Sequence, residues 1–329
     1  MALTYLIQSQ AYDKNVGGFC ALHYLADRLT HLGANVYVTT DKLNPRWQAK
    51  TINTDRPFFL GNSIADRVYG FLGVLKKYVV FNTFKRKLNR LQNRLFPEVL
   101  WRHFDRNQTV VVYTEVTEGN PLEAKHVVRW IMNTPGVLGG DGIYQPTDHI
   151  FQYHPWFTVN PKYTVQGLLT AIDLGYQLKT YQNQYLPNRK GGAYLVRKGR
   201  DKKLDQHPAD FVHADPLLEK MSDEEAAAFF NSIETFISYD DMTWISVQAA
   251  LCGCKSIIIP GQGDRSEENL KKINRIKGVA YGFDDEQWVE STSNELRPHY
   301  EVVNAENLGT IKAFYEYCEK NILRATSQG

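Results

Sequence analysis

The chain has 329 residues, which exceeds one ordinary domain and favours two units of roughly 150 residues each. A composition with 43% hydrophobic and 22% charged residues is typical of a folded globular protein, and it argues against disorder and against a membrane span. The formal net charge is only +2, so no overall field requires a nucleic-acid partner.

The N-terminus has no charged segment followed by an apolar run, so we expect a cytoplasmic protein. The four cysteines are too few and too scattered for a disulfide framework, and their spacing does not suit zinc: Cys20, Cys252, Cys254 and Cys318. We therefore expect reduced core thiols, no metal site and no cofactor.

The first forty residues predict a βαβ unit. Residues 3–7 form a largely apolar run typical of a strand, and residues 19–32 place apolar side chains at helical spacing. Gly33 ends this helix, and residues 36–38 begin the next strand.

The rest of the first half is less regular. Residues 109–113 are a continuous apolar run, typical of a buried parallel strand. Pro121 then opens a predicted helix over residues 122–132, and residues 149–153 fit one more strand. The polar, glycine-rich segment 187–192 indicates a boundary.

From residue 193 the alternation of strands and helices starts again. The expected strands cover residues 193–196, 235–238, 256–259 and 279–281. The expected helices cover 223–231 with Ser222 as N-cap, 243–252 ended by Gly253, 266–275, and 305–321. Strands alternating with short helices predict an α/β fold with two successive parallel sheets.

Ligands of open α/β sheets bind at the carboxyl ends of the strands. In the first unit, the loop at this position ends in Gly17-Gly18, where backbone N–H groups at the start of a helix suit a phosphate or a sugar hydroxyl. A tight strand-to-helix turn explains the same two glycines.

In the second unit, polar residues crowd the start of the helix after the strand 235–238: Tyr239, Asp240, Asp241, Thr243 and, one turn further along, Gln248. In the simplest interpretation Asp241 caps the helix. A cap needs only one residue, however, whereas here several polar side chains gather at the start of the same helix.

This helix resembles a motif of sugar-nucleotide transferases with two Rossmann-like domains, the GT-B glycosyltransferases. The family often carries an acidic residue, seven others, a second acidic residue, and an alanine-rich helix end that closes on glycine before an apolar strand. Asp240 and Gln248 stand at the two acidic positions, and residues 249–260 resemble the rest. Gln248 departs from the pattern, because the family's second carboxylate holds the ribose hydroxyls; an amide can accept and donate similar bonds.

Other segments share this resemblance. The opening βαβ unit is similar to that of the family. Residues 111–122 with 128–130, and residues 194–199, resemble bacterial surface-polysaccharide transferases of this type.

The resemblance implies an α/β fold of the GT-B type, with two Rossmann-like domains facing each other across a cleft. The implied domains are residues 1–185 on the acceptor side, residues 186–304 for the nucleotide-sugar donor, and a C-terminal helix, 305–329, packing back on the N-terminal domain. The implied activity is transfer of a sugar from a nucleotide-sugar donor to a glycan acceptor in surface-polysaccharide biosynthesis.

The implied donor-binding residues are Gly17, Gly18, Arg197, Lys198, Tyr239, Asp240, Thr243 and Gln248. Arg197 and Lys198 follow the first strand of the second domain, where the family places the basic residues that neutralise the donor diphosphate. A fixed cation there stabilises the departing nucleoside diphosphate. A solvated basic turn is the alternative interpretation.

An inverting transfer needs a base that takes the proton of the acceptor hydroxyl, whereas a retaining transfer need not use one. The first-domain carboxylates on strand-end loops are Asp13, Glu115 and Glu118, and these are the candidate catalytic residues. Each of them also suits ordinary hydrogen bonding within a loop.

The segment 76–94 is basic and amphipathic, with seven cations and no acid. It fits a solvated helix face or a helix on an anionic membrane surface. Nucleic-acid binding is the least favoured interpretation, because the rest of the chain offers no recognisable module. The expected partners are thus a nucleotide-sugar donor, a glycan or lipid-linked glycan acceptor, a peripheral membrane contact through 76–94, and no nucleic acid.

Other functions stay open. A dinucleotide-dependent oxidoreductase would need G-x-G-x-x-G in the first strand-helix turn, and a P-loop nucleotidase would need G-x-x-x-x-G-K-[ST]; the sequence lacks both. A nucleotide-sugar epimerase shares the two-domain build. A non-catalytic sugar-nucleotide-binding scaffold subunit fits the glutamine at position 248.

Overall fold

The computed structural model describes residues 3–10, 12–13, 16–39, 47–51, 54–58, 100–241, 243–262 and 266–323. The chain forms two compact units. Unit 1 comprises Met1–Ile172 and Glu306–Gly329, and unit 2 comprises Asp173–Ala305. The basic segment 76–94 lies outside the described residues.

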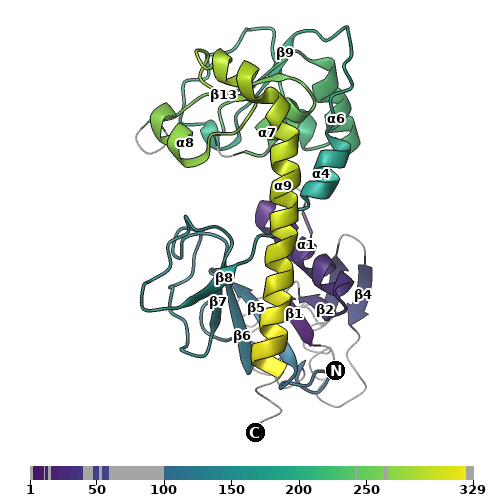
Figure 1. The fold of residues 1–329 in the computed structure, drawn as a ribbon, viewed down its shortest axis with the longest axis vertical. Coiled ribbons are helices and arrows are strands. Elements are labelled where there is room, and N and C mark those ends of the chain that lie inside the picture. The colour runs from purple at the N-terminus through teal and green to yellow at the C-terminus, as the bar shows by residue number, and fades with distance from the viewer. Residues whose placement is uncertain are drawn as a thin grey trace, which may run out of the picture. The chain divides into compact units, whose positions relative to one another are not determined.

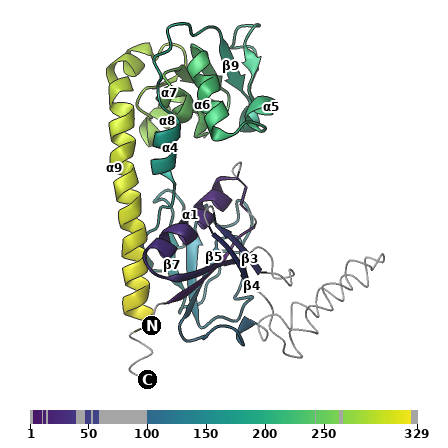
Figure 2. The ribbon, with the colours of Figure 1, turned by 90° about the vertical axis from the view of Figure 1, so that its right-hand side faces the viewer.

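Unit 1 contains a six-stranded sheet in which all neighbouring strands are parallel (Figure 1). In spatial order its strands are β2 (Asn35–Thr39), β1 (Thr4–Gln8), β5 (Thr109–Thr114), β6 (His126–Ile131), β7 (His149–Gln152) and β8 (Val165–Leu168). Figure 2 shows β3 (Trp47–Thr51) and β4 (Thr54–Phe58), which form a separate antiparallel pair. The predicted first two strands and the strand at 109–113 are confirmed.

Alternate residues of the strands build two separate cores. Tyr5 and Ile7 of β1 pack in one core with helix α1 (Gly17–His31) and with Phe314. Leu6, which lies between them in sequence, belongs to the core on the other face of the sheet. This period of two is expected for a strand that is buried on both faces.

The predicted helix over 122–132 is wrong. Residues 126–131 form β6, which lies inside the sheet between β5 and β7. The apolar run there is β-branched and aromatic, and a strand covered on both faces reads as such a continuous run. The turn before β6 is held by Asn120, whose Oδ1 accepts the Ala124 N–H at 3.0 Å.

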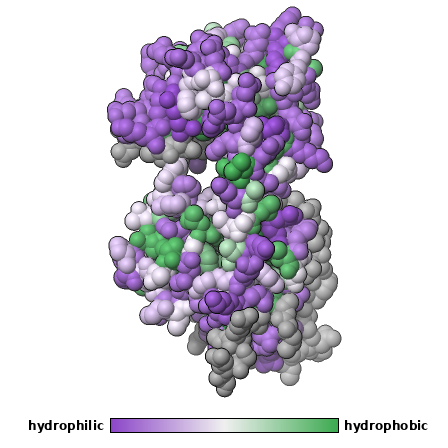
Figure 3. Space-filling model, viewed as in Figure 1, coloured by the Kyte–Doolittle hydropathy of each residue, from purple (hydrophilic) through white to green (hydrophobic). Residues whose placement is uncertain are grey.

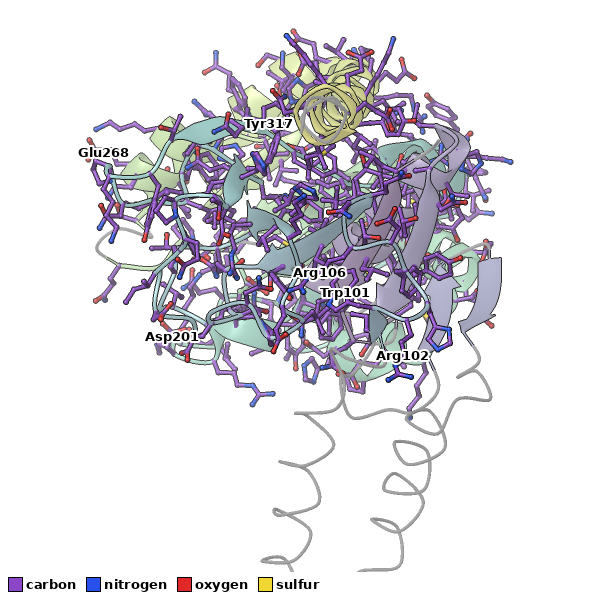
Figure 4. The ribbon with its side chains drawn as sticks, turned by 90° about the horizontal axis from the view of Figure 1, so that it is seen from below. Trp101, Arg102, Arg106, Asp201, Glu268 and Tyr317 are labelled. Atoms are coloured by element: carbon purple, nitrogen blue, oxygen red, sulfur yellow. The ribbon has the colours of Figure 1, made fainter. Side chains whose placement is uncertain are left out.

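The segment 100–107 precedes β5 and supports the same turn. The Trp101 indole N–H donates to the Leu122 carbonyl at 2.7 Å, and the Arg106 guanidinium lies over the Trp101 ring, 5.6 Å from its centroid (Figure 4).

Unit 2 contains a five-stranded, all-parallel sheet. In spatial order its strands are β10 (Val212–His213), β9 (Gly192–Leu195), β11 (Thr235–Ser238), β12 (Lys255–Ile258) and β13 (Val279–Tyr281). Its short helices are α4 (Leu174–Thr180), α5 (Asp215–Leu218), α6 (Asp223–Ser232), α7 (Ile245–Leu251) and α8 (Glu267–Asn274). The two parallel sheets confirm an α/β chain with two Rossmann-like units.

Local signals set the helix ends in unit 2. Ser222 caps α6 as predicted, and a capping box with Glu225 completes the cap. Gly253 follows α7 with a φ of +91°, a conformation that favours glycine. The units divide between Ile172 and Asp173, before α4, whereas the sequence suggested a boundary after residue 185.

The last helix, α9 (Glu286–Cys318), begins well before the predicted residue 305 and contains Pro298. Tertiary contacts hold its first part despite the proline. Leu296 is buried, and the Arg297 guanidinium donates to the Leu178 and Tyr181 carbonyls at 2.9 and 3.1 Å. In unit 1, Tyr317 at the other end (Figure 4) bonds His149 Nδ1 at 2.9 Å. Within the described ranges, no helix has the length and apolar character needed to cross a membrane.

Candidate functional site

A basic turn follows β9 at the carboxyl edge of the unit 2 sheet. Arg197–Gly199 form a single 3₁₀ turn, and Arg197 has a φ of +37°, in the left-handed region. The Asp215 carboxylate accepts the N–H groups of Val196 and Arg197 at 2.8 and 3.2 Å. A Cβ at Gly199 would overlap the Tyr239 carbonyl oxygen, so only glycine fits there. The hydrogen bonds to Asp215 and the close contact of Gly199 with Tyr239 therefore both hold the turn in place.

Lys202 joins the loops that follow three strands. Its ammonium lies 2.8 Å from Asp241 Oδ2, after β11, and 2.7 Å from the Ile259 carbonyl oxygen, after β12. The Lys202 and Asp241 side chains are only 8% and 0% exposed. The sequence analysis missed Lys202, because nothing in the sequence shows that a residue seven positions beyond β9 returns to the sheet edge.

Arg197 and Lys198, the residues predicted to bind the donor diphosphate, lie in a different environment from Lys202. Arg197 is half-buried and Lys198 is exposed. Among the described residues, neither side chain has an ion-pair partner, and nor does Arg200. This edge of the sheet thus combines one buried lysine, paired with Asp241, with three cations that form no ion pair with any described residue. The visible face of unit 2 in Figure 3 is mainly hydrophilic.

The residues after β11 are buried at the same edge. The Tyr239 hydroxyl lies 2.8 Å from both the Gln206 N–H, which it accepts, and His207 Nδ1, and burial raises the pKa of this phenol. Asp240 is 2% exposed, and its carbonyl oxygen accepts the Ser238 hydroxyl at 2.7 Å. The structure therefore brings Asp240 to the basic turn's edge, while the Tyr239 hydroxyl supports the 200–207 loop.

The other two predicted residues lie on or before α7. Thr243 Oγ1 accepts the N–H of Ile245, the first residue of α7, at 3.3 Å. The Gln248 side-chain amide donates to Gln177 Oε1 of α4 at 2.7 Å, and the Trp244 indole N–H donates to the same oxygen at 3.2 Å. Gln248 is thus engaged with α4, an element that the sequence analysis did not predict.

In unit 1, the carboxyl ends of β1 and β5 lie at one edge with the start of α1. Gly17 and Gly18 begin α1 and are exposed, with open space where a Cβ would stand. Asp13 is exposed, and its carbonyl oxygen accepts the Val16 N–H at 3.0 Å. No protein side chain crowds this helix start within the described residues.

The two predicted glutamates differ in burial. Glu118 is exposed. Glu115 is 4% exposed, and its carboxylate accepts the Met132 N–H at 2.9 Å. Burial raises the pKa of Glu115, and the backbone N–H of Met132 offsets part of that rise.

Arg129, in β6, is a further buried ion that the sequence analysis did not select. It forms an ion pair with Asp148 at 2.8 Å and donates to the Thr117 and Gly119 carbonyls. Its guanidinium also lies over the Tyr113 ring, 4.9 Å from the centroid. Arg129 therefore fixes the loop that carries Glu115 and Glu118.

The part of the chain that the structure describes contains no group of three His, Cys, Asp or Glu side chains arranged to hold a metal ion. None of the four cysteines forms a disulfide, and burial raises the pKa of Cys252, Cys254 and Cys318 to about 12.

No protein-family model matches the sequence, and no curated protein matches it either. Two similar solved structures are alpha-glucosyltransferases. One, in complex with UDP and a 13-mer DNA containing a HMU base, is 11% identical, with 100% of this chain and 99% of that chain covered and a TM-score of 0.42. The other, in complex with UDP, is 10% identical, with 99% of each chain covered and a TM-score of 0.37. At these values the likeness establishes no family.

One expectation is contradicted. The sequence analysis excluded nucleic acid as a partner, whereas the first of these structures holds DNA beside UDP. We withdraw that exclusion.

Proposed function

We propose that this chain is a glycosyltransferase that binds the diphosphate of a nucleotide sugar at the carboxyl edge of the unit 2 sheet. The observation that carries the proposal is the fixed basic turn Arg197–Gly199, whose cations form no ion pair with the residues that the structure describes and lie where open α/β sheets bind their ligands. An external anion supplies the missing charge.

The chemistry requires such a group. When the bond between the sugar and the diphosphate breaks, negative charge develops on the leaving phosphate oxygen. The cations of Arg197 and Lys198 stabilise that charge, and a turn that is already ordered needs no reorganisation during the reaction. Asp240, buried at the same edge, is the group best placed to bind a hydroxyl of the sugar or ribose.

On the acceptor side, Glu115 is the favoured base among the three predicted carboxylates. A general base is most effective when its pKa lies near the working pH, and burial moves the pKa of Glu115 in that direction. Gly17 and Gly18 leave open space at the start of α1 for an acceptor or a phosphate.

The acceptor we propose is a glycan of a bacterial surface polysaccharide, on the strength of the resemblance of residues 111–122 and 194–199. DNA belongs in the same assays as a second acceptor class, because one similar structure contains it. Contact of residues 76–94 with a membrane surface stays a prediction.

Isothermal titration calorimetry with UDP, GDP, CMP and dTDP tests the donor site, with NAD and NADP as controls. We expect one nucleoside diphosphate to bind. The variant R197A/K198A should bind it at least about 100-fold more weakly, since each of the two lost bonds to a charged group contributes about 1.5–3 kcal/mol. Lys190→Ala is the matched control, because this exposed lysine precedes β9 at the opposite edge of the sheet.

The other outcomes favour other functions. Binding of NAD or NADP alone would favour an oxidoreductase, and binding of a nucleotide sugar without hydrolysis or transfer would favour a scaffold. Absence of binding by every ligand would contradict the donor site. If a nucleotide sugar binds, product analysis with and without acceptor separates a transferase from an epimerase. Equal affinity of R197A/K198A and wild type would refute the role of the basic turn.

A further inference from the structure

The backbone of Arg197 is strained. The left-handed region is sterically unfavourable for a residue with a side chain, and such strain persists only where the surroundings impose it. Strained residues of this kind are concentrated at ligand-binding sites. The groups that impose the conformation on Arg197 therefore bear on the function of the turn.

Asp215 is the side chain that holds the entry to this strained residue. One carboxylate oxygen accepts the Val196 N–H at 2.8 Å and the other accepts the Arg197 N–H at 3.2 Å. Two successive N–H groups that point to one carboxylate fix the backbone torsions of Val196 and the plane of the peptide group that leads into Arg197. The Gly199 N–H, which donates to the Val196 carbonyl at 2.6 Å, closes the turn around Arg197. Bonds to a charged acceptor are about twice as strong as neutral ones.

The same carboxylate has a third partner. His213 Nε2 lies 2.9 Å from Asp215 Oδ2, and the His213 ring stacks on Tyr194, with centroids 4.9 Å apart and planes 3° from parallel. Backbone and histidine thus occupy the Asp215 carboxylate. It forms no ion pair with the Arg197 guanidinium, although it accepts the backbone N–H of the same residue. The Arg197 cation is left for a ligand.

We infer that Asp215 is a positioning residue for diphosphate binding: it fixes Val196 and the peptide group that leads into the left-handed Arg197, so that the Arg197 and Lys198 side chains meet an anionic ligand. This inference rests on the proposed function of the same site. It assigns to a carboxylate a favourable role in binding an anion, which is the opposite of its direct electrostatic effect.

The sign of one effect tests the inference. Removing a negative charge close to a bound diphosphate strengthens binding if charge alone matters. Loss of the Asp215 hydrogen bonds to the turn, in contrast, weakens binding. We expect D215N to bind UDP, or whichever nucleoside diphosphate the wild type binds, about tenfold more weakly by calorimetry, and inorganic pyrophosphate likewise. Glu219→Gln, an exposed carboxylate just after α5, is the matched control and should bind as the wild type does.

Unchanged or tighter binding by D215N overturns the inference while the proposed function stands. Absence of binding by the wild type overturns the proposed function itself, and the ligand role of Asp215 with it.

A double-mutant cycle, read out by melting temperature, tests without any ligand whether Asp215 stabilises the strained turn. Glycine adopts the left-handed conformation without strain. D215A should therefore lower the melting temperature less in an R197G background than in the wild type. Equal losses in both backgrounds would show that Asp215 does not hold the strained turn.

Discussion

Replacing Arg129 by methionine should strongly destabilise unit 1. The Arg129 and Asp148 side chains are 0% and 3% exposed, and their charged atoms lie 2.8 Å apart. Methionine matches much of the length of the arginine but leaves the Asp148 charge buried without its cation. Breaking a buried pair in this way costs about 3–5 kcal/mol. The Thr117 and Gly119 carbonyls lose their donor as well.

Urea unfolding followed by tryptophan fluorescence measures this loss, since Trp130 is fully buried beside Arg129 in β6. Hydrogen exchange should show faster exchange across the 117–119 loop. The double variant R129M/D148N should recover much of the stability, because it removes the stranded charge. Lys125→Met, at an exposed cation just before β6, should change the free energy of unfolding by no more than about 0.5 kcal/mol.

A loss below about 1 kcal/mol in R129M would refute the reasoning, since it would place this pair in the range of surface ion pairs. A double variant as unstable as the single one would show that lost packing, rather than the stranded charge, causes the effect.

Two further predictions concern buried acids and their partners. K202M should lower the free energy of unfolding by about 3–5 kcal/mol, because Asp241 keeps its buried charge; calorimetric melting of K202M and K202M/D241N checks this, and no recovery in the double variant would contradict it. The pKa of Glu115 is raised above 4.5 by burial, so the stability linked to its protonation is fully present below that pH and is lost as pH rises through the folded pKa. E115Q has no such loss, and its stability relative to wild type should rise from about pH 4 to about pH 7 in urea titrations; a constant difference would rule this linkage out.

The sequence determined much of unit 2, because its signals there are local. Ser222 and Glu225 specify the start of α6, and the run at 235–238 is a strand with the predicted bounds. Gly253 ends α7 because few other residues adopt its backbone conformation. Caps, glycines and apolar runs act over a few residues, so they can be recognised in the sequence without knowledge of the rest of the fold.

Where local signals conflicted, tertiary structure decided. Pro121 and the residues after it suit a helix, but pairing with β5 and β7 makes residues 126–131 a strand. Pro298 interrupts a helical pattern in the sequence, yet α9 passes through it because Leu296 and Arg297 pack on unit 2. Burial and long-range hydrogen bonds outweigh a local preference of a few kcal/mol.

The candidate site divides in the same way. The sequence located the carboxyl ends of the strands, and with them Arg197, Lys198 and Asp240. Only the folded chain brings Lys202 to Asp241 and Asp215 to the backbone of Arg197, because these partners are 39 and 18 residues apart. It also gives Gln248 a partner on α4. A sequence shows which groups follow each strand, whereas the distances among those groups are set by the order of the strands in the sheet.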